Sequence, residues 1–412
     1  MTSARAPLQL RPFRRLLATY AVNGLGDWAG EIALATLVYA ATGSALATAA
    51  LWLVQHCLPG LAAPIVVARL EAVPTARLLP ALHLAQAAIF TLLALLVATD
   101  ALALWLILPL AVIDGLCGPV ARAFARTAVV AVTRPAGLHR EGNVLLNIAF
   151  TINCAAGPAL GGALVLLLGA QTALLADAVT FVAAAALLGL RAGLPASQMP
   201  PEPASERLRE GLAYVRDRPL LRTMLCGEAV AAVLFSAILP IEIVFVIDTL
   251  NSDEAGYGLM LTAWGAGMVV GGALAARLPN LPLPRLLALS SVALGVSHLG
   301  MGLSMSVANA AAWAAFGGLG NGLYTLAFVT ALQERTTDDF QARINGLYEG
   351  MQTSMSGAGF VLGGLLATVA GPRAVYLLAG TGALLTLLWA VARTYDLDWH
   401  LTASAEPAAA RS

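Results

Sequence analysis

Long apolar stretches separated by short polar ones recur along the whole chain. Crossing about 30 Å of hydrocarbon takes about 20 apolar helical residues, and a backbone inside a membrane must satisfy its own hydrogen bonds. The pattern therefore predicts an all-α integral membrane protein with twelve transmembrane helices. These lie at residues 14 to 41, 45 to 69, 76 to 98, 101 to 121, 143 to 169, 171 to 193, 221 to 248, 256 to 278, 284 to 305, 308 to 332, 344 to 370 and 373 to 393.

The longest polar interruption separates six of these stretches from the other six. Its first part is rich in proline and favours an extended linker, and its second part has the apolar spacing of a short helix at the membrane surface. The first apolar stretch is too long for a signal peptide, so we expect it to be retained. The expected domains are an N-terminal six-helix bundle, a cytoplasmic linker, a C-terminal six-helix bundle and a tail, at residues 1–194, 195–220, 221–395 and 396–412.

Composition narrows the function. Hydrophobic residues make up 59% of the 412 residues and charged residues 11%, with a mean hydropathy of +0.80. The 23 basic residues balance 23 acidic ones, so no net field attracts nucleic acid. All the basic residues are arginines, which excludes lysine chemistry. No catalytic triad or metal-ligand spacing occurs, so we expect neither an enzyme nor a bound cofactor or metal.

The arginines also predict the topology. If the N-terminus is cytoplasmic, 22 of the 23 arginines fall on the cytoplasmic side, and only Arg373 falls on the other. This asymmetry matches the positive-inside rule, and one missed or invented helix would destroy it. We therefore expect a multi-pass protein of the inner (plasma) membrane, monomeric within the lipid bilayer, with both termini in the cytoplasm.

The two halves share a pattern at an offset of 202 residues. The sequence GPALGG at 157–162 falls on GFVLGG at 359–364, and Asn143 falls on Asn345. Glycine is abundant, with 39 residues, so some coincidences are due to chance, but the matches keep both their order and their helices. Duplicated bundles hold their ligand near the midplane between the repeats and expose it to each side in turn. The halves therefore indicate a transporter that works by alternating access.

Several motifs resemble those of one transporter family. They are NGLGD at 23–27, TGS at 42–44, GPxxGG at 157–162 and DAVTF at 177–181. Nearly the whole chain resembles the major facilitator superfamily, specifically the drug:proton antiporters that include macrolide-efflux proteins and enterobactin exporters. The resemblance implies outward transport of a small molecule, driven by proton entry along the proton gradient.

One motif of the family is degraded in this chain. The loop after the second helix keeps only Leu70 and the final Arg77 of the usual gating pattern, and its aspartate is absent. Arg69 and Glu71 lie beside that position, and Glu71 is a possible substitute for the missing acid. By contrast, Gly157, Pro158, Gly161 and Gly162 form a small helix face with a proline bend, which suits a hinge and close packing.

Acidic residues inside spanning helices are the first candidates for proton coupling, because burial of an ionised group is costly and favours its protonated form. Asp27 and Glu31 lie one turn apart on one helix face, where two carboxylates disfavour simultaneous ionisation. A structural ion pair for Asp27 is the alternative, and for Asp114 an ion pair with Arg122 or Arg126. The candidates are Asp27, Glu31, Asp114, Glu228 and Glu242.

Polar and aromatic residues in the helices are candidates to line an amphipathic cavity, although packing and interfacial anchoring are common alternatives for the aromatic ones. They are Asn23, Trp28, Gln55, His56, Asn147, Trp264 and Tyr324. The sequence thus favours a proton-coupled exporter of an amphipathic drug, siderophore or secondary metabolite. A lipid or nutrient transporter of the same fold, or a membrane sensor that no longer transports, remains an alternative.

Overall fold

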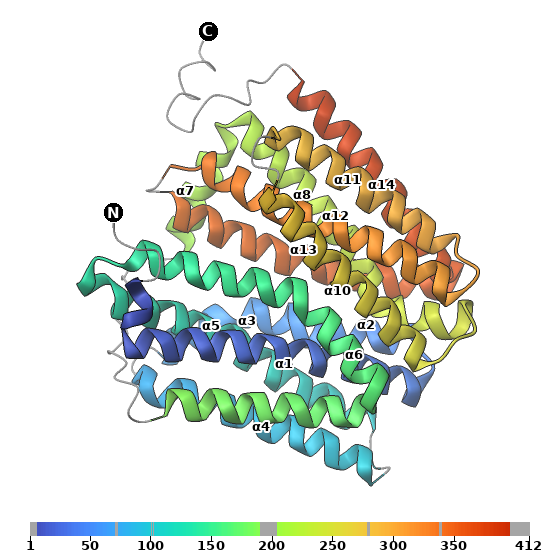
Figure 1. Ribbon diagram of the computed structural model, residues 1–412, viewed down its shortest axis with the longest axis horizontal. Helices are drawn as coiled ribbons and strands as arrows, with labels where there is room; N and C mark the ends of the chain where they lie inside the picture. The colour runs from blue at the N-terminus through green and yellow to red at the C-terminus, as the bar shows by residue number, and fades with distance from the viewer. Residues whose placement is uncertain are drawn as a thin grey trace. The chain divides into compact units, whose positions relative to one another are not determined.

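A computed structural model describes residues 6–70, 73–99, 101, 103–189, 204–277, 281–337 and 340–395 (Figure 1). This part of the chain is helical and contains no strand. The α-helices are α1 (Arg11–Thr42), α2 (Ala45–Trp52), α3 (Leu58–Leu70), α4 (Thr75–Ala98), α5 (Leu104–Thr133), α6 (His139–Leu188), α7 (Ala204–Arg216), α8 (Pro219–Ile238), α9 (Glu242–Val244), α10 (Glu254–Arg277), α11 (Leu283–Gly302), α12 (Val307–Glu334), α13 (Gln341–Ala370) and α14 (Pro372–Thr394).

Two of the predicted membrane helices depart from a plain α-helix. A π-helical segment, η2 (Leu53–Cys57), joins α2 to α3. A 3-10 turn at Leu239–Ile241 and a π-helical segment, η5 (Phe245–Thr249), flank α9 and continue α8. In addition, α6 contains two of the predicted helices, which meet at Gly169, where the backbone leaves the helical region.

With these joins, the described chain contains all twelve predicted membrane helices, and α7 is the predicted linker helix. Ten stretches are long and apolar enough to cross a membrane. α1 is not among the ten, because Asn23, Asp27 and Glu31 make its middle more polar. One of the ten, Leu160–Leu188, runs across the junction inside α6. The all-α, twelve-helix fold predicted from the sequence is confirmed.

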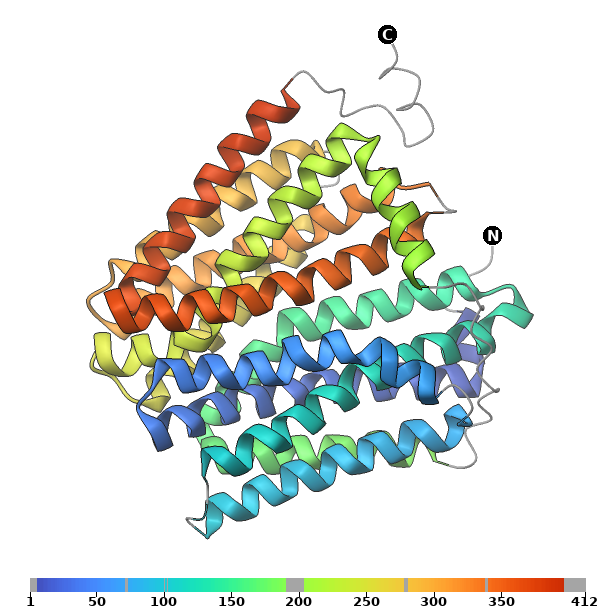
Figure 2. The same ribbon diagram turned by 180° about the vertical axis from the view of Figure 1, so that it is seen from behind.

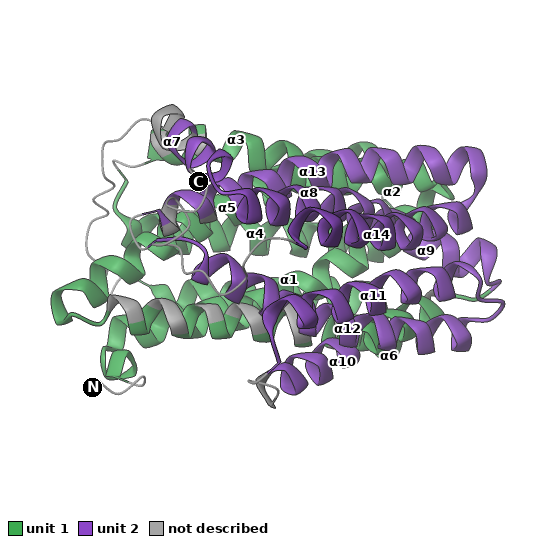
Figure 3. Cartoon of the chain, turned by 90° about the horizontal axis from the view of Figure 1, so that it is seen from above, with its two compact units in different colours: residues 1–200, 252–265 green, residues 201–251, 266–412 purple. Residues whose placement is uncertain are grey.

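The chain divides into two compact units, shown in green and purple in Figure 3. Unit 1 comprises residues 1–200 with 252–265, and unit 2 comprises residues 201–251 with 266–412. In unit 1, α1 packs along α6, and α4 packs against both α5 and α6 (Figures 1 and 2). Phe13, Leu79 and Phe124 are fully buried in an apolar cluster of this unit. The predicted domain limits remain a prediction.

In unit 2, α8 packs against α13 and α14, and α11 packs against α12 and α14. The linker helix α7 packs against α13 and α8, and its Tyr214 stacks on Phe340 with 4.3 Å between the ring centroids. The Tyr214 hydroxyl also accepts a hydrogen bond of 3.0 Å from the backbone N–H of Thr337. The short helix predicted from apolar spacing is therefore anchored by an aromatic residue of its own.

The 202-residue repeat is visible in the backbone. Gly169 has φ 83° and ψ 164°, and Gly371, which is 202 residues later, has φ 82° and ψ 163°. Only glycine adopts such a conformation without strain, so both positions need it. The same offset relates Gly161, which packs on the backbone of Trp28 in α1, to Gly363, which packs on the backbone of Ala237 in α8. The two bundles thus repeat one plan of helix junctions and contacts.

Candidate functional site

Four acidic side chains gather in unit 1. They are Asp27 and Glu31 from α1, Asp114 from α5 and Asp177 from the second half of α6. The carboxyl group of Asp27 interacts electrostatically with Glu31 and Asp114, and that of Asp177 interacts with the other three. We call these four residues the unit 1 acid cluster. Neighbouring carboxylates disfavour simultaneous ionisation, which is the property that proton coupling requires.

Asp27 and Glu31 have different partners although they share a helix face. The Asn23 amide, one turn earlier, lies 3.1 Å from each carboxylate oxygen of Asp27. Glu31 Oε1 lies 3.2 Å from Nε2 of His56, whose ring stacks on Trp52 with 4.9 Å between the centroids. The side chains of His56 and Glu31 are 34% and 23% exposed. This pair of ionisable groups is therefore accessible to water, and Asp27 lies one helical turn away.

Asp114 is buried, and an amide donates to each of its oxygens. Gln86 Nε2 lies 2.9 Å from Oδ1, and Gln55 Nε2 lies 3.2 Å from Oδ2. The sequence left open an ion pair with one of the arginines that follow in α5; the hydrogen bonds of Asp114 come from α4 and η2 instead. Two donors fix the carboxyl group in place, so Asp114 is well suited to be a stationary member of the cluster.

The π-helical segment η2 supplies two of the contacts with the cluster. Gln55 and His56 are consecutive in η2, and they bind Asp114 and Glu31. A π-helical turn holds one more residue than an α-helical turn and often occurs at functional sites. Here it allows neighbouring residues to reach acids on two different helices. Both residues were predicted as cavity candidates, but their pairing with the acids was not.

Asp177, from the DAVTF motif at 177–181, lies in the second half of α6. Its side chain is fully buried against Gly26 and Gly30 of α1, the glycines on either side of Asp27. Oδ1 lies 3.2 Å from the Thr180 hydroxyl, and Oδ2 has no hydrogen-bond partner. The signal in the sequence was the spacing of those two glycines, which leaves room for a polar side chain from another helix.

In unit 2, Glu228 of α8 is buried and has three hydrogen-bond donors. The Tyr324 hydroxyl lies 2.5 Å from Oε2, and the Tyr348 hydroxyl and Gln352 Nε2 each lie 3.3 Å from Oε1. Gln352 also donates to Tyr348. We call these four residues the Glu228 network. Tyr324, predicted to line a cavity, is thus a ligand of a buried acid.

Glu242 is the second buried acid of unit 2, and no described residue hydrogen-bonds to its carboxyl group. It follows Pro240 and lies in the irregular part of the helix, between a 3-10 turn and the π-helical segment η5. Apolar neighbours such as Ile243 and Phe245 are fully buried beside it in sequence. A buried carboxyl group without a partner is costly, which makes Glu242 a candidate for protonation or for binding a ligand.

The glycine motif of α6 packs against α1. A Cβ atom at Gly157 would overlap the Trp28 indole, and one at Gly161 would lie 3.0 Å from the Trp28 backbone. Trp28 is therefore a packing residue of the α1–α6 contact. Gly162 approaches the backbone of Gly258, which also belongs to unit 1. The motif provides the close helix contact predicted from its spacing, and its role as a hinge stays a prediction.

The remaining candidates are spread more widely. Trp264 is buried in α10, and Arg69 and Arg77 are exposed at the ends of α3 and α4. Leu70 is partly buried beside the apolar cluster of unit 1. Glu71 and the side chains of Asn147 and Pro158 lie outside the described residues. Within the described part, no group of three histidine, cysteine, aspartate or glutamate residues could hold a metal ion.

Several solved structures share this fold at low sequence identity. A mutant of the nucleoside transporter NupG matches with a TM-score of 0.71 at 10% identity, covering 93% of this chain and 99% of that one. A bacterial homologue of the human lysosomal transporter Spinster, in an inward-facing and unoccupied conformation, matches with a TM-score of 0.66 at 11% identity, covering 100% and 98%. The human organic anion transporter MFSD10 matches with a TM-score of 0.57 at 17% identity, covering 92% and 99%.

At such low identities these structures establish the fold alone. A search of curated protein sequences finds no significant match. The family comparison is more specific, because the family described as transmembrane secretion effectors matches residues 2–405, which is nearly the whole chain. Its members and the structural neighbours are transporters of the major facilitator type rather than enzymes. The chain therefore belongs to the transmembrane secretion effector family of the major facilitator superfamily, and it is a multi-pass membrane transporter.

Proposed function

We propose that this transporter exports amphipathic small molecules in exchange for protons, with both termini in the cytoplasm of a cell whose inner membrane it spans. The observation that carries the proposal is the unit 1 acid cluster, in which four acids interact within one bundle. Acids inside membrane-spanning helices are costly, and proton coupling gives these four a function. The distribution of 22 arginines on one side supports the orientation.

The proton enters, in this proposal, at the Glu31–His56 pair. This pair is partly exposed, and its two groups are 3.2 Å apart, close enough for direct proton transfer. Asp27 lies one turn from Glu31 on the same face of α1, so the charge of one carboxylate opposes ionisation of the other. In this proposal the two acids share one proton, and the substrate competes with it.

Asp114 serves as the fixed member of the site. Gln55 holds one of its oxygens, and the next residue, His56, contacts Glu31. A change of protonation at Glu31 therefore acts on η2, and through Gln55 on α5. This gives a physical route from proton binding to movement of helices, since the extra residue of a π-helical segment allows a helix to adjust locally.

The acid cluster favours a cationic or proton-donating substrate over an anionic one. The ionisable side chains with which the cluster interacts are mostly acids, and an ionised substrate of the opposite sign would replace the bound proton. NupG and MFSD10 are named for nucleosides and organic anions, and those substrates belong to proteins with little sequence identity to this one. We therefore propose amphipathic cations as the first class to test.

Proton release on substrate entry tests the proposal. The purified protein is reconstituted into liposomes with an acidic interior that contains the pH indicator pyranine, and ethidium is added outside as an amphipathic cation. We expect the interior to become less acidic at a rate that depends on ethidium, and Glu31→Gln to abolish this response. Asp217→Asn, which neutralises an exposed acid beside Arg216, is the matched control and should respond like the unmodified protein.

Two outcomes would contradict the proposal. Equal ethidium uptake with and without a pH gradient, and no proton movement, would contradict the coupling. A response that persists in Glu31→Gln and in Asp27→Asn would exclude the acid cluster as the proton site. Thermal unfolding with erythromycin and ethidium then separates loss of binding from loss of coupling, because a compound that binds only the folded state raises the unfolding temperature.

A further inference from the structure

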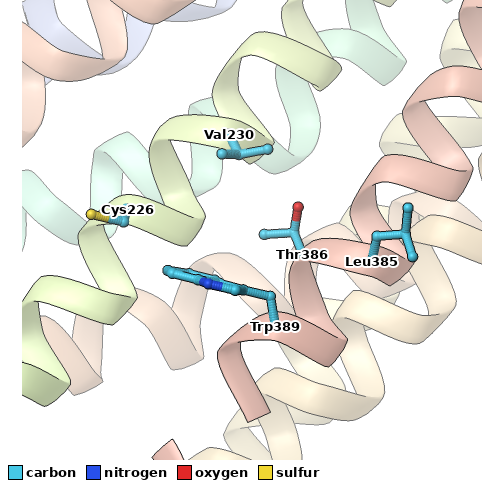
Figure 4. A pocket seen from close by; sticks show the side chains of 5 residues that line it. All are labelled: Cys226, Val230, Leu385, Thr386 and Trp389. Atoms are coloured by element: carbon cyan, nitrogen blue, oxygen red, sulfur yellow. The ribbon is translucent and has the colours of Figure 1, made fainter. Parts of the chain in front are cut away.

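Unit 2 has an apolar groove on its outer surface between α8 and α14. Figure 4 shows its lining, with two side chains from α8 and three from α14 facing a common space. The volume of the groove is about 310 Å³. Its lining residues are Cys226, Val230, Leu385, Thr386 and Trp389. A Cβ atom added at Gly227 would lie 3.7 Å from the Thr386 side chain and 3.9 Å from that of Trp389, so this turn of α8 faces α14.

The groove opens away from the interior of the bundle. Val230, Leu385 and Trp389 are 46%, 60% and 40% exposed, although all three lie in membrane-spanning helices. The only hydroxyl in the groove, that of Thr386, already donates to the Gly382 carbonyl oxygen at 2.7 Å. Apart from the indole N–H of Trp389 and the thiol of Cys226, the rest of the lining is hydrocarbon, so a hydrocarbon chain fits the groove better than a polar solute does.

Two arginines lie beyond the same end of the groove. α8 and α14 run in opposite directions, since Gly227 faces Trp389 whereas Leu234, farther along α8, faces Gly382, which is earlier in α14. Arg222 lies one turn before Cys226, and Arg393 lies one turn after Trp389. Both are therefore about 6 Å past the groove on the same side, and both are exposed.

The charges of these arginines are available to a ligand. Arg222 uses one nitrogen to donate to the backbone carbonyl of Arg216 at 3.3 Å, which leaves the rest of the guanidinium group. Neither arginine forms an ion pair with a described acid. Basic residues at the end of an apolar groove between membrane helices match the headgroup and acyl chain of an anionic lipid, and guanidinium groups bind phosphate well.

We propose that this groove binds an anionic phospholipid. One acyl chain lies against Val230, Leu385 and Trp389, and the headgroup phosphate is held by Arg222 and Arg393. The site lies on the bilayer-facing surface of unit 2 and is independent of the acid cluster in unit 1. It therefore stands whether or not the transporter moves protons.

Lipid binding to the intact, delipidated protein tests the proposal by native mass spectrometry. Phosphatidylglycerol and phosphatidylcholine with identical acyl chains are added separately. We expect tighter binding of phosphatidylglycerol, weakened about fivefold by Arg222→Gln or Arg393→Gln and more by the double variant. Arg285→Gln removes the same charge at the start of α11, outside the groove, and should leave binding unchanged. Equal binding of the two lipids, or equal loss in all variants, would overturn the proposal.

A second measurement locates the acyl chain and does not depend on the arginine variants folding. Cys226 is the exposed cysteine of the described residues, so its alkylation by N-ethylmaleimide can be followed after Cys57, Cys117 and Cys154 are replaced by alanine. We expect phosphatidylglycerol to slow this alkylation several-fold, whereas inorganic phosphate at the same concentration has no effect. Protection by phosphate would indicate an anion site without a lipid. Equal protection by phosphatidylcholine would show that any lipid fills the groove, and both results contradict the proposal.

Discussion

The acid cluster of unit 1 and the Glu228 network of unit 2 place their acids in opposite kinds of surroundings. In unit 1, four acids interact with one another, and Asp177 keeps an oxygen without a partner. In unit 2, the single carboxyl group of Glu228 has three donors to itself. Acids in a cluster compete for protons, whereas an acid with a full set of donors has little to gain by changing its state. We therefore propose the acid cluster, rather than Glu228, as the site of proton exchange, and Glu242 stays the protonation candidate of unit 2.

The difference arises although both units follow one plan. The glycines that make close helix contacts recur at the 202-residue offset, as Gly161 and Gly363 show. The acids do not recur, because Asp114 corresponds to Phe316 and Asp177 to Ala379. Packing positions and chemical positions in a repeated bundle can therefore change separately, since a helix contact depends on small side chains and a proton site on a few polar ones.

The largest expected effect is on proton coupling, when an acid of unit 1 is removed and compared with an acid of unit 2. Asp27→Asn should lower ethidium-coupled proton flux by about 100-fold or more, because the amide cannot accept the proton. Glu228→Gln should keep the coupling, although it weakens the network around it. The measurement is pyranine fluorescence in proteoliposomes with matched protein content. If Glu228→Gln uncouples transport and Asp27→Asn does not, the assignment to unit 1 is wrong.

The Glu228 network should matter more for stability. Tyr324→Phe deletes the shortest hydrogen bond of the network and leaves a buried carboxyl group with fewer donors. We expect a loss of about 1.5–3 kcal/mol in the free energy of unfolding, the range for hydrogen bonds to charged groups. Thermal unfolding of the detergent-solubilised protein measures it, with the exposed Tyr395→Phe as the control. An unchanged unfolding temperature would mean that the network contributes little.

The shared glycine contacts should respond alike in the two units. Gly157→Ala forces a Cβ atom into Trp28, and Gly359→Ala forces one into the α8 backbone near Val233. Each should destabilise the protein by about 1–3 kcal/mol, the usual cost of overpacking. Gly346→Ala, which has open space around it, should not, and the unfolding temperature in detergent compares the three variants. A lower unfolding temperature for only one of the first two variants would show that the two units share the glycine pattern in sequence but not the close helix packing.

The smallest effect is expected at the linker helix. Arg343 of α13 lies 3.1 Å from Glu210 of α7, and both side chains are partly exposed. Because water screens such a pair, Arg343→Gln should change the free energy of unfolding by about 0–1 kcal/mol. Denaturation at low and high salt measures it. A larger, salt-sensitive loss would show that this ion pair holds α7 against unit 2 more firmly than the stacking of Tyr214 on Phe340 does.

Local features of the site could be predicted from the sequence, but the hydrogen-bond partners of its acids could not. The spacing of Asp27 and Glu31 places them on one helix face, because a helix repeats every 3.6 residues. Gln55 and Gln86, however, are 59 and 28 residues from Asp114, and no local rule indicates that they converge on it. The partners of Glu228 are still farther away, with Gln352 lying 124 residues along the chain.

The sequence alone determined the twelve helices, the repeat and the acids that lie inside the membrane. Each follows from local chemistry, since about 20 apolar residues must form a helix in lipid and a buried acid is recognisable by its neighbours. Only the tertiary structure decided which acids meet, that Asp177 joins the cluster and that Glu228 is enclosed by its own donors. Helix rotation and the π-helical segment at Leu53–Cys57 fix these contacts, and both depend on packing between residues far apart in the chain.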